Sequence, residues 1–368
     1  MSKEELLSFL NNTKTKAVTW DDLFCDNIDI NYLKRVDKFF KKGLNYYLDP
    51  HTPHKSSESS VFFRKSKFNA ELNLESRRIV SEFEDKKLSL SAMAKLSDYN
   101  FDRKIPIFHT NQNAKEVAKH LRKDLLPVFS IHKREFLKGL IDKLAEFNIF
   151  VFEFIETWNK KNVANIDGFF LNPNVIVLKR QQKSFSREIF TLVHELGHYL
   201  LNEEEAEEVD IVNYANNNLS IIERWCNDFA YNFLLGDFSE DIDTVNKFDA
   251  SNDYGYELIN EISSKTHLSK IAIFTNLLLQ NKLSKADYYM IKSEIEENWR
   301  KKFEEEEAEK ELAKLEGREQ RGSVPKPIQS PLFIDTLRIA FYDGIIGEYD
   351  FCKSMNISPN KITKYLSL

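Results

Sequence analysis

The stretch Arg187-Glu-Ile-Phe-Thr-Leu-Val-His-Glu-Leu-Gly-His-Tyr-Leu-Leu201 decides how the rest of the chain is interpreted. Its apolar residues recur at three- and four-residue steps, which predicts an amphipathic helix over about 184–203. On such a helix His194 and His198 lie about 40° apart around the axis. Both imidazoles can therefore reach one metal ion, with Glu195 beside them.

The context of this H-E-x-x-H pattern matters, because so short a pattern also arises by chance. Ser184 or Ser186 can cap the start of the predicted helix. Gly197 is costly in a helix interior, and we explain it by close packing of another element against that turn. The alternative interpretation is two surface histidines on a core helix, and these features weigh against it.

The donor set indicates a catalytic zinc ion, which takes three protein ligands and keeps one position open for water. Glu195 would then act as general base on that water and as acid toward the leaving amine. An oxyanion also needs a donor, and three tyrosines lie near in the sequence. The sequence does not choose among Tyr199, Tyr214 and Tyr231.

The third ligand must come from outside the motif. A longer pattern, H-E-x-x-H-x-x-G-x-x-H, is excluded because Leu201 and Glu204 occupy its Gly and His positions. We therefore expect a carboxylate. The acidic run 203–208 with Asp210 follows directly, but Glu203 would point about 140° away from the second histidine. We interpret this run as a solvated helix end.

The next predicted helix, over 217–235, offers Glu223 and Asp228. Glu223 borders its apolar stripe, whereas Asp228 falls on the polar side. A buried carboxylate needs a partner, and a metal ion would be one. We therefore predict Glu223 as the third ligand, with a salt bridge to Arg187 or Arg224 as the alternative.

Three short segments before the motif helix are rich in β-branched and aromatic residues, at 148–154, 167–171 and 175–178. They predict a small sheet. We expect the last strand, 175–178, to pair with an extended substrate backbone, which would make the substrate a peptide. Most other segments show helical periodicity, so the predicted fold is α+β and mainly helical.

The composition restricts the binding partners and the cellular compartment that we expect for the protein. The 368 residues carry a net charge of −6, which gives no overall basic footprint for nucleic acid. The three cysteines, Cys25, Cys226 and Cys352, are odd in number and far apart, which favours a reducing compartment. No apolar run is long enough to span a membrane, and the N-terminus does not look like a signal peptide. We therefore expect a cytoplasmic protein without a membrane partner.

The motif and its surroundings resemble the ImmA/IrrE family of metallopeptidases. The similarity lies in Ile166-Asp-Gly-Phe-Phe-Leu, Val175-Ile-Val-Leu, the motif helix, and Glu223-Arg-Trp-Cys-Asn-Asp-Phe-Ala-Tyr-Asn-Phe-Leu-Leu235. The last block resembles the family's E-x-x-A-N-x-F-A-x-x-L-L, with Cys226 in place of Ala. The resemblance implies a zincin-like core, with His194, His198 and Glu223 as zinc ligands and Glu195 as the catalytic acid/base.

The resemblance also implies a role, and the polar breaks at 51–60 and 322–327 suggest the other domain boundaries. Family members cleave a cognate repressor or antitoxin, often encoded nearby, in stress responses, mobile elements or phage defence. We divide the chain into a helical region 1–60, a metallopeptidase domain 61–240 with its core at 140–236, a helical region with a charged linker 241–322, and a small helical domain 323–368 that resembles a helix-turn-helix.

Two other functions stay open from the sequence. One is a transcriptional regulator that binds DNA or a partner and has a structural or vestigial metal site. The intact Glu195 speaks against it, because a structural site needs no base. The other is a zinc hydrolase of a non-peptide substrate.

Overall fold

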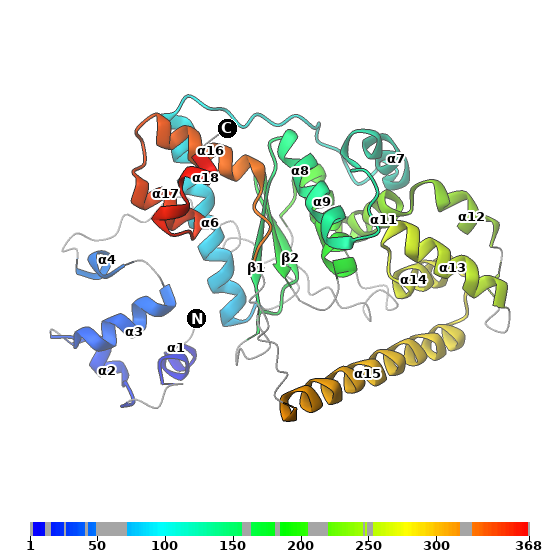
Figure 1. Ribbon diagram of the computed structural model, residues 1–368, viewed down its shortest axis with the longest axis horizontal. Helices are drawn as coiled ribbons and strands as arrows, with labels where there is room; N and C mark the ends of the chain where they lie inside the picture. Colours follow the sequence, from blue (N-terminus) through cyan, green and yellow to red (C-terminus); the bar gives the residue numbers. More distant parts are fainter. Residues whose placement is uncertain are drawn as a thin grey trace.

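The structure is a computed structural model, and it shows a small sheet enclosed by helices (Figure 1). This confirms the predicted α+β, mainly helical fold. The residues that it describes are 3–11, 16–25, 27–40, 43–48, 72–156, 163–180, 185–204, 220–245, 247–248, 253–316 and 326–366.

The sheet has three strands, β1 (Phe150–Ile155), β2 (Gly168–Leu171) and β3 (Val175–Arg180), in the order β1-β3-β2. β3 pairs in parallel with β1 and antiparallel with β2. The expectation that the strand at 175–178 binds substrate is therefore wrong, because both edges of β3 are already paired. β1 and β2 are therefore the two edge strands of the sheet.

One face of the sheet packs on the helix that carries the motif. Successive strand side chains point to opposite faces, and Val151, Phe170, Ile176 and Leu178 face this side. The helices of this layer are α8 (Lys133–Glu146) and α9 (Phe185–Leu201), with α11 (Ile221–Leu235) and α7 (Ala114–Leu125) packed beyond them.

The other face of the sheet is covered from both ends of the sequence. Phe152 contacts Phe83 of α6 (Leu74–Leu96) and Phe333 of α16 (Pro331–Tyr342). Helices α17 (Glu348–Met355) and α18 (Thr363–Leu366) extend the same hydrophobic cluster. The C-terminal helices thus share a core with the sheet, while the proposed domain boundaries stay a prediction.

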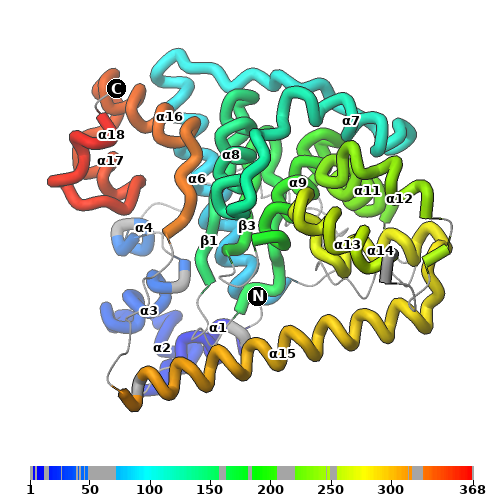
Figure 2. The backbone as a smooth tube through the Cα atoms, turned by 45° about the vertical axis from the view of Figure 1, so that its right-hand side comes forward, coloured from blue at the N-terminus to red at the C-terminus, as the bar shows by residue number. Residues whose placement is uncertain are grey.

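The remaining helices flank this core. Helices α7 and α8 are separated by a connection that contains Pro127. The long helix α15 runs along one side of the molecule in Figure 2. None of the described helices is both long and apolar enough to cross a membrane. The other helices are α1 (Lys3–Leu10), α2 (Trp20–Leu23), α3 (Ile30–Phe40), α4 (Leu44–Leu48), α12 (Ser239–Thr244), α13 (Asp253–Thr266), α14 (Lys270–Leu279) and α15 (Lys285–Leu315).

Two arginines hold the C-terminal ends of the central helices. Arg103 donates to the carbonyl of Tyr199 near the end of α9. Arg122 donates to the carbonyl of Phe233 near the end of α11. Carbonyls at a helix end lack intrahelical partners and carry the negative end of the helix dipole, so a guanidinium there satisfies both. Each arginine thereby fixes the C-terminal end of its helix.

Lys86 of α6 is held between aromatic rings where α6, β1 and α16 meet. Its ammonium lies 3.9 Å from the ring centre of Phe152 and 4.2 Å from that of Phe333. Burial lowers the pKa of Lys86 to about 8, against a partly compensating effect of Glu82. Protonated Lys86 is therefore disfavoured in the folded state relative to the unfolded chain.

We expect Lys86 to make folding depend on pH in the alkaline range. Between about pH 8 and pH 10.4, the ordinary lysine pKa, the unfolded chain binds more protons, so the free energy of unfolding rises with pH. Lys86→Met should flatten this rise in urea unfolding measured across that range. Lys95→Met, at an exposed position of the same helix, should keep it. Equal slopes in both variants would contradict the assignment.

Candidate metal centre

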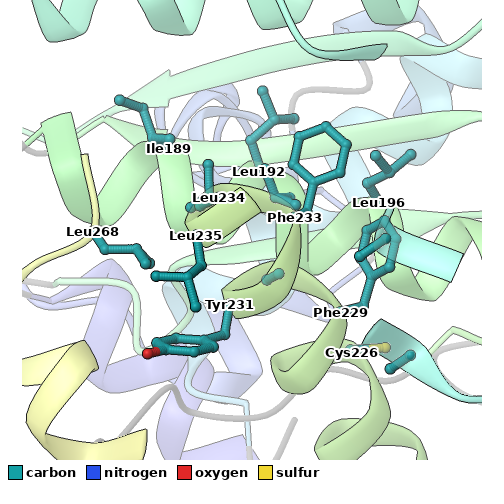
Figure 3. Close-up of a cluster of buried hydrophobic side chains, with 14 of the residues drawn as sticks. Ile189, Leu192, Leu196, Cys226, Phe229, Tyr231, Phe233, Leu234, Leu235 and Leu268 are labelled. Atoms are coloured by element: carbon teal, nitrogen blue, oxygen red, sulfur yellow. The ribbon is translucent and has the colours of Figure 1, made fainter. Parts of the chain in front are cut away.

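Helix α9 buries the whole motif in the interior. Ile189, Leu192 and Leu196 point into the core shared with α11, as Figure 3 shows. This apolar face holds the helix in one rotation about its axis. His194, Glu195 and His198 are consequently buried as well. Three polar side chains in such a place need partners or a ligand.

The contact between α9 and α11 depends on Gly197. A Cβ atom at this position would stand 3.0 Å from Cys226 Cα and 3.1 Å from Cys226 Sγ. A side chain at this position would be tighter against the backbone of α11 than an ordinary contact, so a glycine suits this close approach. This confirms that Gly197 is present because another element packs against its turn, and it brings the start of α11 to the two histidines.

His194, His198 and Glu223 converge on one point. The Glu223 carboxylate oxygens lie 3.2 Å from His194 Nε2 and 3.1 Å from His198 Nε2. The two Nε2 atoms are 3.2 Å apart. Ligand atoms about 2.05 Å from a tetrahedral zinc ion are about 3.3 Å from each other. The three residues thus have the spacing of three corners of a coordination tetrahedron.

Asn227, one turn after Glu223 on α11, orients His194. Its Oδ1 lies 2.8 Å from His194 Nδ1. Because an amide oxygen only accepts, Nδ1 carries the proton and Nε2 presents a lone pair to the centre. Metal-binding histidines are commonly fixed in this way by a second hydrogen bond.

The charge of the centre also fits a cation. Burial alone would raise the pKa of Glu223, but His194 and His198 outweigh it and lower that pKa. An ionised Glu223 therefore faces two ring nitrogens, one of which is fixed as an acceptor. A cation between these three groups satisfies all of them at once.

Glu195 differs from the three converging residues. Burial raises its pKa to about 7, against the effects of the nearby histidines. Its Oε2 is buried without a hydrogen-bond partner among the described residues. The Oε1 atom lies 3.2 Å from where a Cβ would stand on Gly168 of β2. The carboxylate is thus placed between the histidines and the edge of the sheet, with a pKa suited to proton transfer near neutral pH.

The rival ligand candidates lie elsewhere. Arg187 forms an ion pair with Asp167, whereas Glu223 faces the two histidines. Asp228 has Arg224 as its nearest charge. Glu204 is buried and accepts from the Asn172 N–H at 2.7 Å, so the solvated interpretation of the acidic run is wrong at that residue. Residues 205–210 of this run and Tyr214 lie outside the described residues.

Tyr199 and Tyr231, the two described candidates for the oxyanion donor, lie in different parts of the structure. Tyr199 packs under Arg103 and against Phe170 in the core behind α9. Tyr231 lies on a different face of α11, and its hydroxyl points out of the apolar cluster in Figure 3. Neither contact places a hydroxyl at the three converging atoms.

A comparison with protein-family models agrees with this geometry. Residues 146–247 match the model described as the IrrE N-terminal-like domain, Peptidase_M78. The chain carries an ImmA/IrrE-family metallopeptidase domain. The resemblance noted from the sequence is thereby confirmed, and the matched range includes the sheet, α9 and α11. No curated protein matches the chain.

Sequence reasoning gave no role to two residues of this metallopeptidase domain. Asn227 was noted only as part of a family-like block, although its place one turn from Glu223 puts it on the same helix face. Gly168 was noted only as part of a strand. Its closeness to Glu195 depends on how β2 packs on α9, which no local pattern encodes.

We expect Gly197→Ala to destabilise the metallopeptidase domain by about 1–3 kcal/mol through overpacking. This exceeds the gain of about 1 kcal/mol in helix propensity that alanine brings. Urea unfolding would measure the difference. Ser91→Ala, at an exposed position of α6, provides the propensity effect alone and should not destabilise. A Gly197→Ala protein as stable as the wild type would show that the helices do not need this close contact.

Proposed function

We propose that the chain is a zinc-dependent endopeptidase that cleaves a regulatory protein. The observation that carries this proposal is the convergence of His194, His198 and Glu223, whose ligand atoms all lie within 4.8 Å of one another. Glu195 stands beside them and takes no part in the cluster. Two imidazoles and one carboxylate are a donor set of catalytic zinc sites in peptidases.

His194, His198 and Glu223 would hold the zinc ion, which when bound polarises a carbonyl group and makes a water molecule easier to deprotonate. Glu195 would take the proton from the attacking water and pass it to the leaving amine. Burial raises the pKa of Glu195, which makes its carboxylate a stronger base than that of an exposed glutamate. Asn227 would keep His194 in the tautomer that binds metal.

The substrate backbone would add to the edge of β2 rather than to β3. Lys179 N–H donates to the carbonyl of Asp167, and hydrogen-bonded pairs alternate along an antiparallel ladder. The N–H and C=O groups of Gly168 and Phe170 therefore point away from β3. Gly168 also lies against Glu195. An extended peptide paired with this edge would place a carbonyl carbon beside the general base.

The resemblance to the family supports a regulatory protein as substrate, and we propose a repressor or antitoxin encoded nearby. The setting would be a stress response, a mobile element or phage defence. A DNA-binding regulator with a structural metal site is the weaker candidate. A purely structural site would give no reason to bury the Glu195 carboxylate, whose Oε2 has no partner in the described part of the chain, because that burial costs free energy.

We expect Glu195→Gln to abolish cleavage of the neighbouring repressor while zinc stays near one ion per chain. The amide has the size of the carboxylate but cannot accept the proton. His194→Ala should lose both zinc and cleavage. Mass spectrometry of the repressor and metal analysis of the purified proteins would measure these outcomes. Full cleavage by Glu195→Gln would refute the endopeptidase function.

We expect Asn227→Leu to weaken zinc binding by about 10- to 100-fold, because His194 loses the group that fixes its tautomer. Asn227→Asp keeps an acceptor at the same place and should retain most of the affinity. Competition with a chromophoric zinc chelator would measure both. Equal affinity in Asn227→Leu and the wild type would contradict the role given to this hydrogen bond.

A further inference from the structure

A cavity of about 780 Å³ lies along α11 on the side next to the metal-ligand face. Its walls come from residues 110–115 at the start of α7, from α11 and α12, and from the end of α14. It falls in the size range of ligand sites in proteins. None of the roles given above to His194, Glu195, His198 and Glu223 requires it.

The cavity begins at the level of the metal centre. Arg224 lines it and follows Glu223 directly, while Leu235 lines it at the other end of α11. At 1.5 Å per helical residue this is about 16 Å, the length of about five residues of extended chain. Asn227 connects the cavity with the metal centre, because it lines the cavity and is hydrogen-bonded to His194.

The lining is rich in carboxamides, which hydrogen-bond to peptide groups in both directions. Gln112 and Asn113 use their side-chain oxygens on backbone N–H groups of the described chain, so they offer their amide N–H groups to a ligand. Asn232 donates to the Asp228 carbonyl and so offers its oxygen. The wall thus offers both donors and acceptors, and a peptide backbone has both kinds of group.

The charges on the wall cancel. Lys115 pairs with Asp243 at 2.9 Å, and Arg224 lies near Asp228. Two basic and two acidic side chains line the cavity, which gives it no net charge. A phosphate or a nucleic acid would have to break these pairs, whereas an uncharged peptide backbone would not.

One residue of the cavity wall, Tyr231, has a buried hydroxyl group. Tyr231 is 5% exposed, and its hydroxyl has no hydrogen-bond partner within the described ranges. The hydroxyl points away from the apolar cluster around Phe229 and Leu235 (Figure 3). Burying an unpaired hydroxyl costs free energy, and a ligand that pairs with it would recover that cost.

We propose that this cavity binds an extended peptide segment of the substrate, about five residues on one side of the scissile bond, through hydrogen bonds to its backbone. This rests on the proposed endopeptidase function. Asn276 and Gln280 line the cavity from the end of α14, where Gln280 Nε2 donates to Asn276 Oδ1 at 2.8 Å. Together with Tyr231 they are positioning residues in this arrangement, because they would contact substrate away from the bond that breaks. The cavity selects segments that are extended and uncharged.

The test uses the zinc-loaded full-length chain and a peptide library made by digesting a proteome with trypsin. Mass spectrometry identifies which peptides are cut and how fast. The wild type should cut only peptides with about five residues beyond the scissile bond on one side. Tyr231→Phe and the pair Asn276→Ala with Gln280→Ala should lower kcat/KM for those peptides about tenfold and relax the length requirement.

Control measurements separate positioning from folding. Tyr231→Phe removes one unpaired oxygen atom, so the melting temperature and zinc content should not fall. Asn260→Ala changes a carboxamide on the exposed face of α13, outside the cavity, and should behave as the wild type. A second measurement is fluorescence anisotropy of the fastest-cut peptide, labelled with fluorescein, on zinc-loaded Glu195→Gln. Adding Tyr231→Phe should weaken that Kd about tenfold.

Two results would overturn the inference in different ways. Cleavage by the wild type with the same length requirement, rates and Kd in the cavity variants would refute the cavity's role and leave the endopeptidase function intact. A zinc-loaded wild type that cuts no library peptide and no neighbouring repressor would refute the endopeptidase function, and the peptide assignment with it.

Discussion

The close packing of α11 on α9 at Gly197 is the contact on which the centre depends. It allows the backbone at Cys226 to come within van der Waals distance of the motif helix. This approach carries Glu223, less than one turn earlier on α11, to the two imidazoles. The metal centre is therefore a product of helix packing, and the apolar cluster in Figure 3 supplies the free energy that holds three polar groups together.

The sheet also helps to position the residues of the metal centre. Its apolar residues fix α9 from one face, while α6 and α16 cover the other. β2, at the edge, brings Gly168 against Thr191 and Glu195, and a larger side chain there would clash with Thr191 Cγ2 first and then crowd the carboxylate. The proposed general base, Glu195, therefore lies next to the free edge of β2. A substrate that pairs with β2 and lies along α11 would pass the metal centre between the two.

Helix periodicity made much of the centre predictable. The spacing of His194 and His198, and the place of Glu223 beside an apolar stripe, follow from 100° per residue. The expectation that β3 pairs with substrate failed, because a strand's two neighbours are chosen by contacts far away in the sequence. The solvated interpretation of Glu204 also failed, because its partner Asn172 is a turn residue brought close only by the fold.

The sequence by itself determined the family, the motif helix, the α+β class and the residues that converge, since each of these is written in local spacing. Only the tertiary structure decided which strands lie at the edges of the sheet, that Asn227 orients His194, and that a neutral cavity runs along α11. These features arise where elements distant in the chain meet. Their side chains gain a role only from the neighbours that packing gives them.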